Sequence, residues 1–156
     1  MSKIKYNTDG FQLLTELKAG LLTLPVAAST KIEKGHAVHD NGSGYMVDSV
    51  TAFTSLFMGI AAATVDNSTG NAGDKNVLVI PPVSGHRFAV PVAADNLVAI
   101  TDRGVVCDLE AAGTIDTSDE SVASGPGFMV EEIDVSADAV AVNTYGYAIG
   151  RFTYIS

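Results

Sequence analysis

Residues 56–109 decide the fold class of this chain, and they read LFMGIAAATVDNSTGNAGDKNVLVIPPVSGHRFAVPVAADNLVAITDRGVVCDL. Valine, isoleucine and phenylalanine recur there in short runs, and each run ends in Gly, Pro, Asn or Asp. This pattern is typical of short strands joined by tight turns. No reactive nucleophile motif, metal-ligand cluster or phosphate-binding glycine loop interrupts the segment. It therefore predicts a β scaffold.

The composition bounds the class of protein. The chain has 156 residues, 47% apolar residues, no Trp and one Cys, which indicates a single domain without an internal disulfide. The first twenty residues lack a continuous apolar core, and the longest nearly uncharged run, 49–65, is shorter than the roughly 18–20 residues of a membrane helix. We therefore expect a protein that is made in the cytoplasm, is not secreted and has no membrane partner.

The net charge of −9 is unevenly distributed. Residues 1–94 carry seven acidic and seven basic side chains, whereas eleven acidic and two basic side chains follow from Asp95 onward. Nucleic-acid phosphates require clustered Lys and Arg, so direct nucleic-acid binding is not expected. The acidic half is interpreted either as the outer face of a protein that docks through another face, or simply as a solvated surface.

The first twenty residues form a predicted N-terminal arm. The helical spacing of Phe11, Leu14 and Leu17, with Asp9 as a possible N-cap, predicts a short helix or turn over residues 9–19. Within residues 1–8, Ile4 and Tyr6 alternate with Lys3 and Lys5, which would allow this segment to add as a strand to another sheet. A terminus that packs on its own domain is the alternative.

Residues 21–156 are predicted to form a single, mainly β domain. We expect a small barrel or sandwich of short antiparallel strands, with at most one or two short helices in the whole chain. Outside residues 66–127, the predicted strands are Leu21–Ala27, Thr30–Glu33, Ala37–His39, Tyr45–Asp48, Leu56–Val65, Phe128–Val135, Ala139–Val142 and Tyr145–Ile155. A hairpin tip is predicted at 40–44, and long exposed loops are predicted at 66–74 and 111–127.

The three histidines are the candidate metal ligands of the sequence. His36 and His39 are three residues apart, which would point them to opposite faces of a strand, and His86 could join them only through the fold. We interpret them as turn and surface residues, with zinc as the alternative. The 66–74 loop is rich in oxygen-bearing side chains, but its acids lack calcium-loop spacing, and the glycosylation sequon at Asn67 has little meaning without secretion.

The remaining reactive side chains have ordinary interpretations. Cys107 lies in an apolar strand-like run, where a free thiol usually packs as a small apolar group. The acids Glu131, Glu132 and Asp134 could serve acid–base chemistry, but adjacent acids on a strand more often protect an edge. We therefore predict no catalytic residue, no metal and no cofactor, and hence no enzyme.

Several short motifs resemble a known family. They are Gly59-Ile60-Ala61, Val77-x-Val79, Gly85-x-x-Phe88-x-x-Pro91-Val92, Gly104-Val105-Val106 and the closing run Tyr147-Ala148-Ile149-Gly150-Arg151-Phe152. Together they resemble the lambda-type head decoration proteins of tailed bacteriophages, also called cement or auxiliary capsid proteins, of the β-tulip type. The resemblance covers residues 31–155, although the 111–127 loop makes this chain longer than the lambda-type members.

The resemblance implies a structural virion protein. Such proteins bind the outer capsid surface as homotrimers and stabilise the head by bridging subunits of the major capsid protein. An N-terminal arm commonly reaches the capsid protein, and the capsid-binding residues expected here are Lys3, Ile4, Lys5, Tyr6 and Phe11. The alternatives are a phage tail or baseplate structural protein, and a small cytosolic β-barrel enzyme or ligand-binding module that uses the three histidines.

Overall fold

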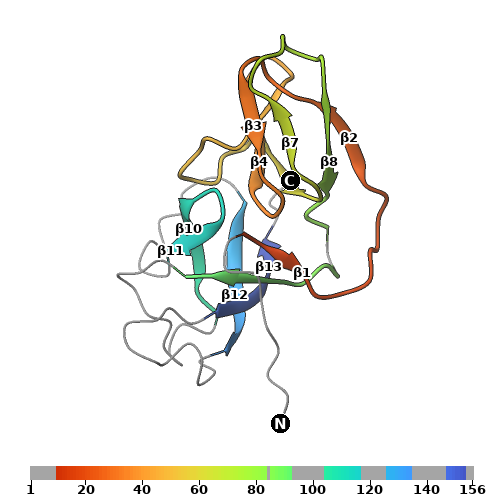
Figure 1. Ribbon diagram of the computed structural model, residues 1–156. Helices are drawn as coiled ribbons and strands as arrows, with labels where there is room; N and C mark the ends of the chain where they lie inside the picture. Colours follow the sequence, from red (N-terminus) through yellow and green to blue (C-terminus); the bar gives the residue numbers. More distant parts are fainter. Residues whose placement is uncertain (1–9, 84, 93–103, 117–125, 135–146, 154–156) are drawn as a thin grey trace.

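The computed structural model describes residues 10–83, 85–92, 104–116, 126–134 and 147–153, and this part of the chain folds into three antiparallel sheets without a helix (Figure 1). The six-stranded sheet has the order β1 (Gln12–Leu13), β9 (Phe88–Pro91), β13 (Tyr147–Thr153), β12 (Gly127–Asp134), β10 (Val106–Ala111), β11 (Thr114–Asp116). The five-stranded sheet has the order β2 (Leu22–Pro25), β8 (Asn76–Ile80), β6 (Phe57–Ala61), β4 (Ala37–Asp40), β5 (Met46–Val47). Strands β3 (Thr30–Ile32) and β7 (Val65–Asn67) form a pair of their own.

The predicted mainly β class is confirmed. None of the sheets formed by the described strands closes on itself, so this part of the chain fits the sandwich alternative and not the barrel alternative. In Figure 1 the six-stranded sheet lies in the lower part of the molecule, and β2, β3, β4, β7 and β8 lie above it. The chain passes from the lower part to the upper part between β1 and β2, and returns between β8 and β9.

Two hydrophobic cores hold these layers together. The larger core joins the six-stranded and five-stranded sheets, and it contains all six phenylalanines of the chain. Phe152 lies near its centre, with ring centroids 4.9 Å from Phe57 and 5.2 Å from Phe88, so it contacts side chains from both sheets. The smaller core lies between the five-stranded sheet and the β3–β7 pair, and it is built from Val, Ile, Ala and Met. Aromatic pairs in the larger core add to the free energy of burial.

Two motif glycines are required by close backbone packing. Gly59 has φ +138, and a Cβ there would overlap the carbonyl oxygen of Ile80 on the neighbouring strand. A Cβ at Gly150 would overlap the carbonyl oxygen of Met129 in the same way. The Gly-Ile-Ala and Ala-Ile-Gly motifs therefore carry glycine because their strands pass too close to a neighbouring backbone for a side chain.

Most predicted strands are present, with shorter bounds. The hairpin tip at 40–44 is confirmed, since Asp40 pairs with Met46 and the Asp40 carboxylate accepts the N–H groups of Gly42 and Gly44. The predicted strand at 56–65 is divided into β6 and the start of β7. The predicted strand at Ala139–Val142 lies outside the described residues.

The helix predicted over residues 9–19 is wrong. Residues 12 and 13 form strand β1, which pairs with Ala89 and Phe88, and Phe11 is buried in the larger core. The helix was predicted from the spacing of Phe11, Leu14 and Leu17, which would share one buried helix face. Leu14 and Leu17 are instead exposed by 39% and 46%, so the spacing does not mark a buried face. The domain therefore begins by residue 10, inside the segment that was assigned to the arm.

The long exposed loop predicted at 111–127 is also wrong in part. Residues 114–116 form β11, which closes a hairpin with β10, and Ile115 is fully buried in the larger core. The 66–74 loop is shorter than predicted, because β7 extends to Asn67. In both cases one buried side chain inside a hydrophilic run, Ile115 or Asn67, ties the chain to residues far away in the sequence, which local composition does not indicate.

Candidate functional site

A groove opens where the two larger sheets meet. It has a volume of about 280 Å³, and its lining residues come from β1, β6, the end of β8 and the turn before β4: Phe11, Gln12, Leu13, Lys34, Ala61, Ala62 and Ile80. Among the described lining residues only Lys34 is charged, and apolar and polar groups share the surface of the groove. A concave site with one charged group is a candidate for ligand binding.

The turn at residues 33–36 fixes the shape of this groove. Gly35 donates its N–H to the Ala61 carbonyl at 2.9 Å and accepts the Phe11 N–H at 2.7 Å. The turn therefore joins the five-stranded sheet to β1 of the six-stranded sheet. The Lys34 N–H is held by the Thr64 hydroxyl at 3.0 Å. These hydrogen bonds hold the backbone of Lys34 in place, so its side chain starts from a fixed point.

Strand β1 presents a free edge to the groove. Hydrogen-bonding groups alternate along an antiparallel strand, and the Leu14 N–H donates to the Arg87 carbonyl next to β9 at 2.8 Å. The Phe11 N–H points the opposite way, to Gly35. Leu13 has the same parity as Phe11, so its N–H and carbonyl face away from β9 and towards the groove. This is the arrangement of an edge strand that can accept a further strand.

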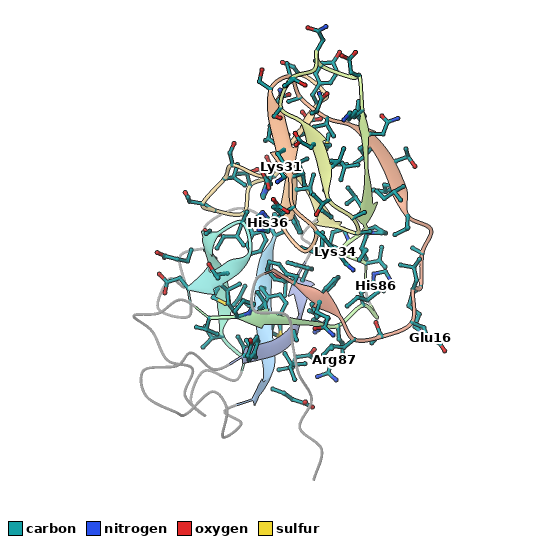
Figure 2. The ribbon with its side chains drawn as sticks, viewed as in Figure 1. Glu16, Lys31, Lys34, His36, His86 and Arg87 are labelled. Carbon is teal, nitrogen blue, oxygen red and sulfur yellow. The ribbon has the colours of Figure 1, made fainter. Side chains whose placement is uncertain are left out.

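Lys34 has the chemistry to bind an anion there. Its neighbour Glu33 is paired with Lys31 at 3.1 Å, and no ion pair of Lys34 with a described residue is found. Figure 2 shows Lys34 between the upper and lower parts of the molecule. An exposed ammonium without a carboxylate partner favours binding of a negatively charged group.

The three histidines do not converge on a metal. His36 Nδ1 lies 2.8 Å from the Asp48 carboxylate in a half-buried pair, and Figure 2 places His36 well apart from His86. His86 belongs to the connection between β8 and β9, and it is buried against the connection between β1 and β2. Its Nε2 accepts the Lys18 N–H, and its Nδ1 donates to the Pro81 carbonyl. Within the described ranges, no three His, Cys, Asp or Glu side chains gather as potential metal ligands. The interpretation of His39 and His86 as surface residues is wrong, since both are buried.

His39 has an unusual environment for an imidazole. It is fully buried on β4, and neither ring nitrogen has a hydrogen-bond partner among the described residues. Its ring centroid lies 5.2 Å from that of Phe57 and 6.4 Å from that of Phe53. Burial without a compensating partner disfavours the charged form and lowers the pKa of His39 to about 4. His39 is therefore a neutral core residue. The residue pattern predicted a strand at this position, but it did not predict that the His39 side chain is buried.

The polar loop after β7 is organised by Asn67. This side chain is buried, and its Nδ2 donates to the carbonyls of Ala27 and Asn71 at 3.0 and 2.9 Å. Its Oδ1 has no hydrogen-bond partner in the described chain and lies against Gly70, where a Cβ would overlap it. Asn67 therefore fixes the loop structurally, and its amide is not accessible for glycosylation in the folded protein.

The remaining candidates also have structural roles. Cys107 is fully buried and donates its thiol to the Phe128 carbonyl at 3.4 Å, so the interpretation as a packed residue is supported by its place in the core. Glu131 pairs with Arg87 at 3.3 Å and with Arg151 at 3.8 Å on the outer side of the six-stranded sheet. Glu132 lies 3.5 Å from Arg87. Partly exposed ion pairs of this kind contribute little to stability.

The expected arm residues are divided by the structure. Lys3, Ile4, Lys5 and Tyr6 lie outside the described residues. Phe11 is 3% exposed, with its ring centroid 5.5 Å from Phe128 and 5.3 Å from Phe152, so it belongs to the core and is not available to a partner while the domain is folded. The assignment of Phe11 to a capsid-binding arm is therefore corrected.

A surface with exposed apolar side chains lies along the connections between the sheets. Because β1 pairs with β9 and β2 pairs with β8, the connection 14–21 lies beside residues 81–83 and 85–87 of the connection between β8 and β9 (Figure 1). They are joined by the Lys18 N–H bond to His86 at 2.7 Å. We define the apolar strip as the four large apolar residues exposed there, by 36 to 46%: Leu14, Leu17, Leu21 and Val83. The helix predicted over residues 9–19 would have buried Leu14 and Leu17, so the sequence analysis did not indicate that they are exposed on a connection between the sheets.

Comparison with known proteins adds no identification. The chain matches no protein-family model, no curated protein and no solved structure. None of the described segments forms a helix long and apolar enough to cross a membrane.

Proposed function

We propose that this chain is a structural virion protein of the head decoration type, which binds the outer surface of a tailed-bacteriophage capsid as a homotrimer and bridges subunits of the major capsid protein. The observation that carries this proposal is the apolar strip. Large apolar side chains that are exposed on two connections lying side by side favour a protein–protein contact, since leaving them in water costs free energy. The protein would be made in the host cytoplasm and act on the assembled head.

The motif residues behind the resemblance support the proposal in a second way. Gly59 and Gly150 allow close backbone packing, and Phe88 is fully buried in the larger core. These residues build a rigid sandwich, which is what a protein needs when its task is to hold others together through surface area. Many copies on one shell would convert a modest affinity at each site into strong overall binding.

The arm remains part of this proposal. Residues 1–9 lead directly into Gly10 and β1, which is the edge strand of the six-stranded sheet. A segment that leaves the body at this edge can extend towards a neighbouring subunit. Ile4 and Tyr6 would then be the alternate anchors of an added strand, with Lys3 and Lys5 between them.

The experiment that tests the proposal measures mass and capsid binding together. Light scattering of the purified protein is expected to give the mass of a trimer, and the protein is expected to co-sediment with expanded shells assembled from the capsid protein of the same genome. A monomer at all concentrations that also stays in the supernatant would overturn the proposal. Stoichiometric zinc in such a monomer would support the enzyme or ligand-binding alternative instead.

A further inference from the structure

We propose that the groove beside β1 binds the C-terminal end of an extended peptide, which adds antiparallel to β1, places an apolar last side chain between the sheets and pairs its terminal carboxylate with Lys34. This inference does not rest on the proposed capsid function. It follows from the main-chain groups, the closed end and the charge of the groove.

The main-chain groups of Leu13 provide the docking edge. Its N–H and carbonyl face the groove, so an extended peptide residue opposite Leu13 can exchange two hydrogen bonds with it. All described ladders of the sheets are antiparallel, and an added antiparallel strand would continue that pattern. The peptide would become the strand next to β1 in the six-stranded sheet.

The groove admits the end of a chain better than its middle. At Phe11 the free edge of β1 is already occupied, because the Phe11 N–H donates to the Gly35 carbonyl. An added strand that runs antiparallel to β1 therefore meets the 33–36 turn as it moves from Leu13 towards Phe11. The peptide has to end or bend away at that point, and the end it presents in an antiparallel arrangement is its C-terminus.

The charge at the closed end fits a carboxylate. Lys34 belongs to the turn that closes the groove, its backbone is fixed by Thr64, and the adjacent Glu33 is engaged by Lys31. A terminal carboxylate placed there would form a charge-assisted hydrogen bond with the Lys34 ammonium. The groove is built from residues between 11 and 80, and residues 1–94 carry seven acidic and seven basic side chains, so the acid excess of the chain lies outside the sequence that forms the groove.

The size of the groove limits what else enters it. Its volume of about 280 Å³ lies just below the lower end, roughly 300 Å³, of typical small-molecule pockets. Its walls beside Lys34 include Ala61, Ala62 and Ile80, which are apolar. The groove therefore suits one large apolar side chain with a carboxylate beside it, and we assign leucine, isoleucine or valine to the last position of the peptide.

The test uses the full chain and a defined probe. The probe is a fluorescein-labelled hexapeptide of alternating valine and threonine that ends in leucine with a free carboxylate, titrated by fluorescence anisotropy. Its C-terminal amide is expected to bind at least about tenfold more weakly, and Lys34→Met is expected to weaken the carboxylate form by a similar factor. Lys75→Met is the control, because Lys75 is an exposed lysine that does not line the groove and its ammonium donates to the Asp66 carbonyl.

Three outcomes would overturn the proposal. They are the absence of saturable binding to the unaltered protein, equal binding of the carboxylate and amide forms, and equal binding to Lys34→Met. An amidated peptide that carries an aspartate near its end tests whether a side-chain carboxylate is sufficient, and binding equal to that of the free C-terminus would also contradict the assignment. Loss of peptide binding in Lys34→Met with unchanged shell binding would separate this site from the proposed capsid contact.

Discussion

His39 is the residue whose burial has the most direct energetic consequence. In the unfolded chain its imidazole is expected to titrate near its ordinary pKa of 6.5, whereas in the folded protein the pKa is lowered to about 4. Between these values the unfolded state binds a proton that the folded state does not, so the free energy of unfolding decreases as the pH falls through this window. The loss approaches about 3 kcal/mol at the acid end.

The first prediction concerns a substitution that removes the titrating imidazole of His39. His39→Leu, which keeps a similar volume and removes two unpartnered nitrogens, is expected to be at least as stable as the unaltered protein at pH 7 and to lose the part of the pH dependence between 6.5 and 4 that His39 contributes. The measurement is urea unfolding at several pH values. The unaltered protein is the reference in the same pH series, because hydrogen-bonded carboxylates such as Asp48 and Asp108 contribute to the pH dependence of both proteins. An unchanged pH profile in the variant would contradict the prediction.

The second prediction concerns the strand crossing at Gly150. Gly150→Ala is expected to lower the free energy of unfolding by about 2–4 kcal/mol, because the new methyl group would overlap the Met129 carbonyl and force β12 and β13 apart. Gly20→Ala is the matched control, since no atom lies within 4 Å of its added Cβ, and its effect is expected to stay within about 0.5 kcal/mol. Chemical denaturation measures both. Equal stability of the two variants would show that the strands can separate without cost.

At the scale of elements, β1 decides where the domain begins. Deletion of residues 1–8 is expected to leave the melting temperature unchanged, since Phe11 and the pairing of β1 with β9 are retained, and to abolish shell binding if the arm provides the capsid contact. Deletion of residues 1–14 removes both β1 and Phe11, and the loss of the Phe11 ring alone would cost about 3–5 kcal/mol. Thermal unfolding monitored by circular dichroism distinguishes the two deletions. A longer deletion that melts normally would show that β1 is dispensable.

The strands were predictable where the pattern is local. Alternation and turn residues located β3, β4, β8 and the hairpin tip at 40–44, because each of these follows from side chains within a few residues. Strand β1 was missed because its pairing partner, β9, is about seventy-five residues away in the sequence, and local spacing favoured a helix. Strand β11 pairs with the adjacent strand β10, but it was missed because it lies in a hydrophilic run and its one apolar residue, Ile115, is buried by distant residues such as Val92.

The candidate site was less predictable than the fold. Lys34 and Leu13 carry no local signal for binding, and they are brought together only because the 33–36 turn joins the two sheets. The histidines show the opposite case. Their residue type indicated chemistry, but the structure places them in separate surroundings, where hydrogen bonds or aromatic packing account for each one.

At the scale of the whole molecule, the apolar strip sets the expected association behaviour. Leu17→Asp is expected to shift the protein towards the monomer and to weaken shell binding, because a carboxylate would replace one of the four exposed apolar side chains of the strip. Leu56→Asp is the matched control: Leu56 is exposed by 44%, close to the 46% of Leu17, but belongs to the connection between β5 and β6. Light scattering over a range of concentrations measures the effect. Equal association of the two variants would exclude the strip as the contact.

The position of β13 affects the order in which the two larger sheets can form during synthesis of the chain. It is the last described strand in the sequence, yet it lies between β9 and β12 in the middle of its sheet, and it carries Phe152 into the centre of the larger core. The five-stranded sheet needs only residues 22–80, so a nascent chain can complete it while the ribosome is still translating. The six-stranded sheet cannot form until Tyr147–Thr153 has left the exit tunnel, and until then β9 and β12 have open edges that chaperones would have to protect.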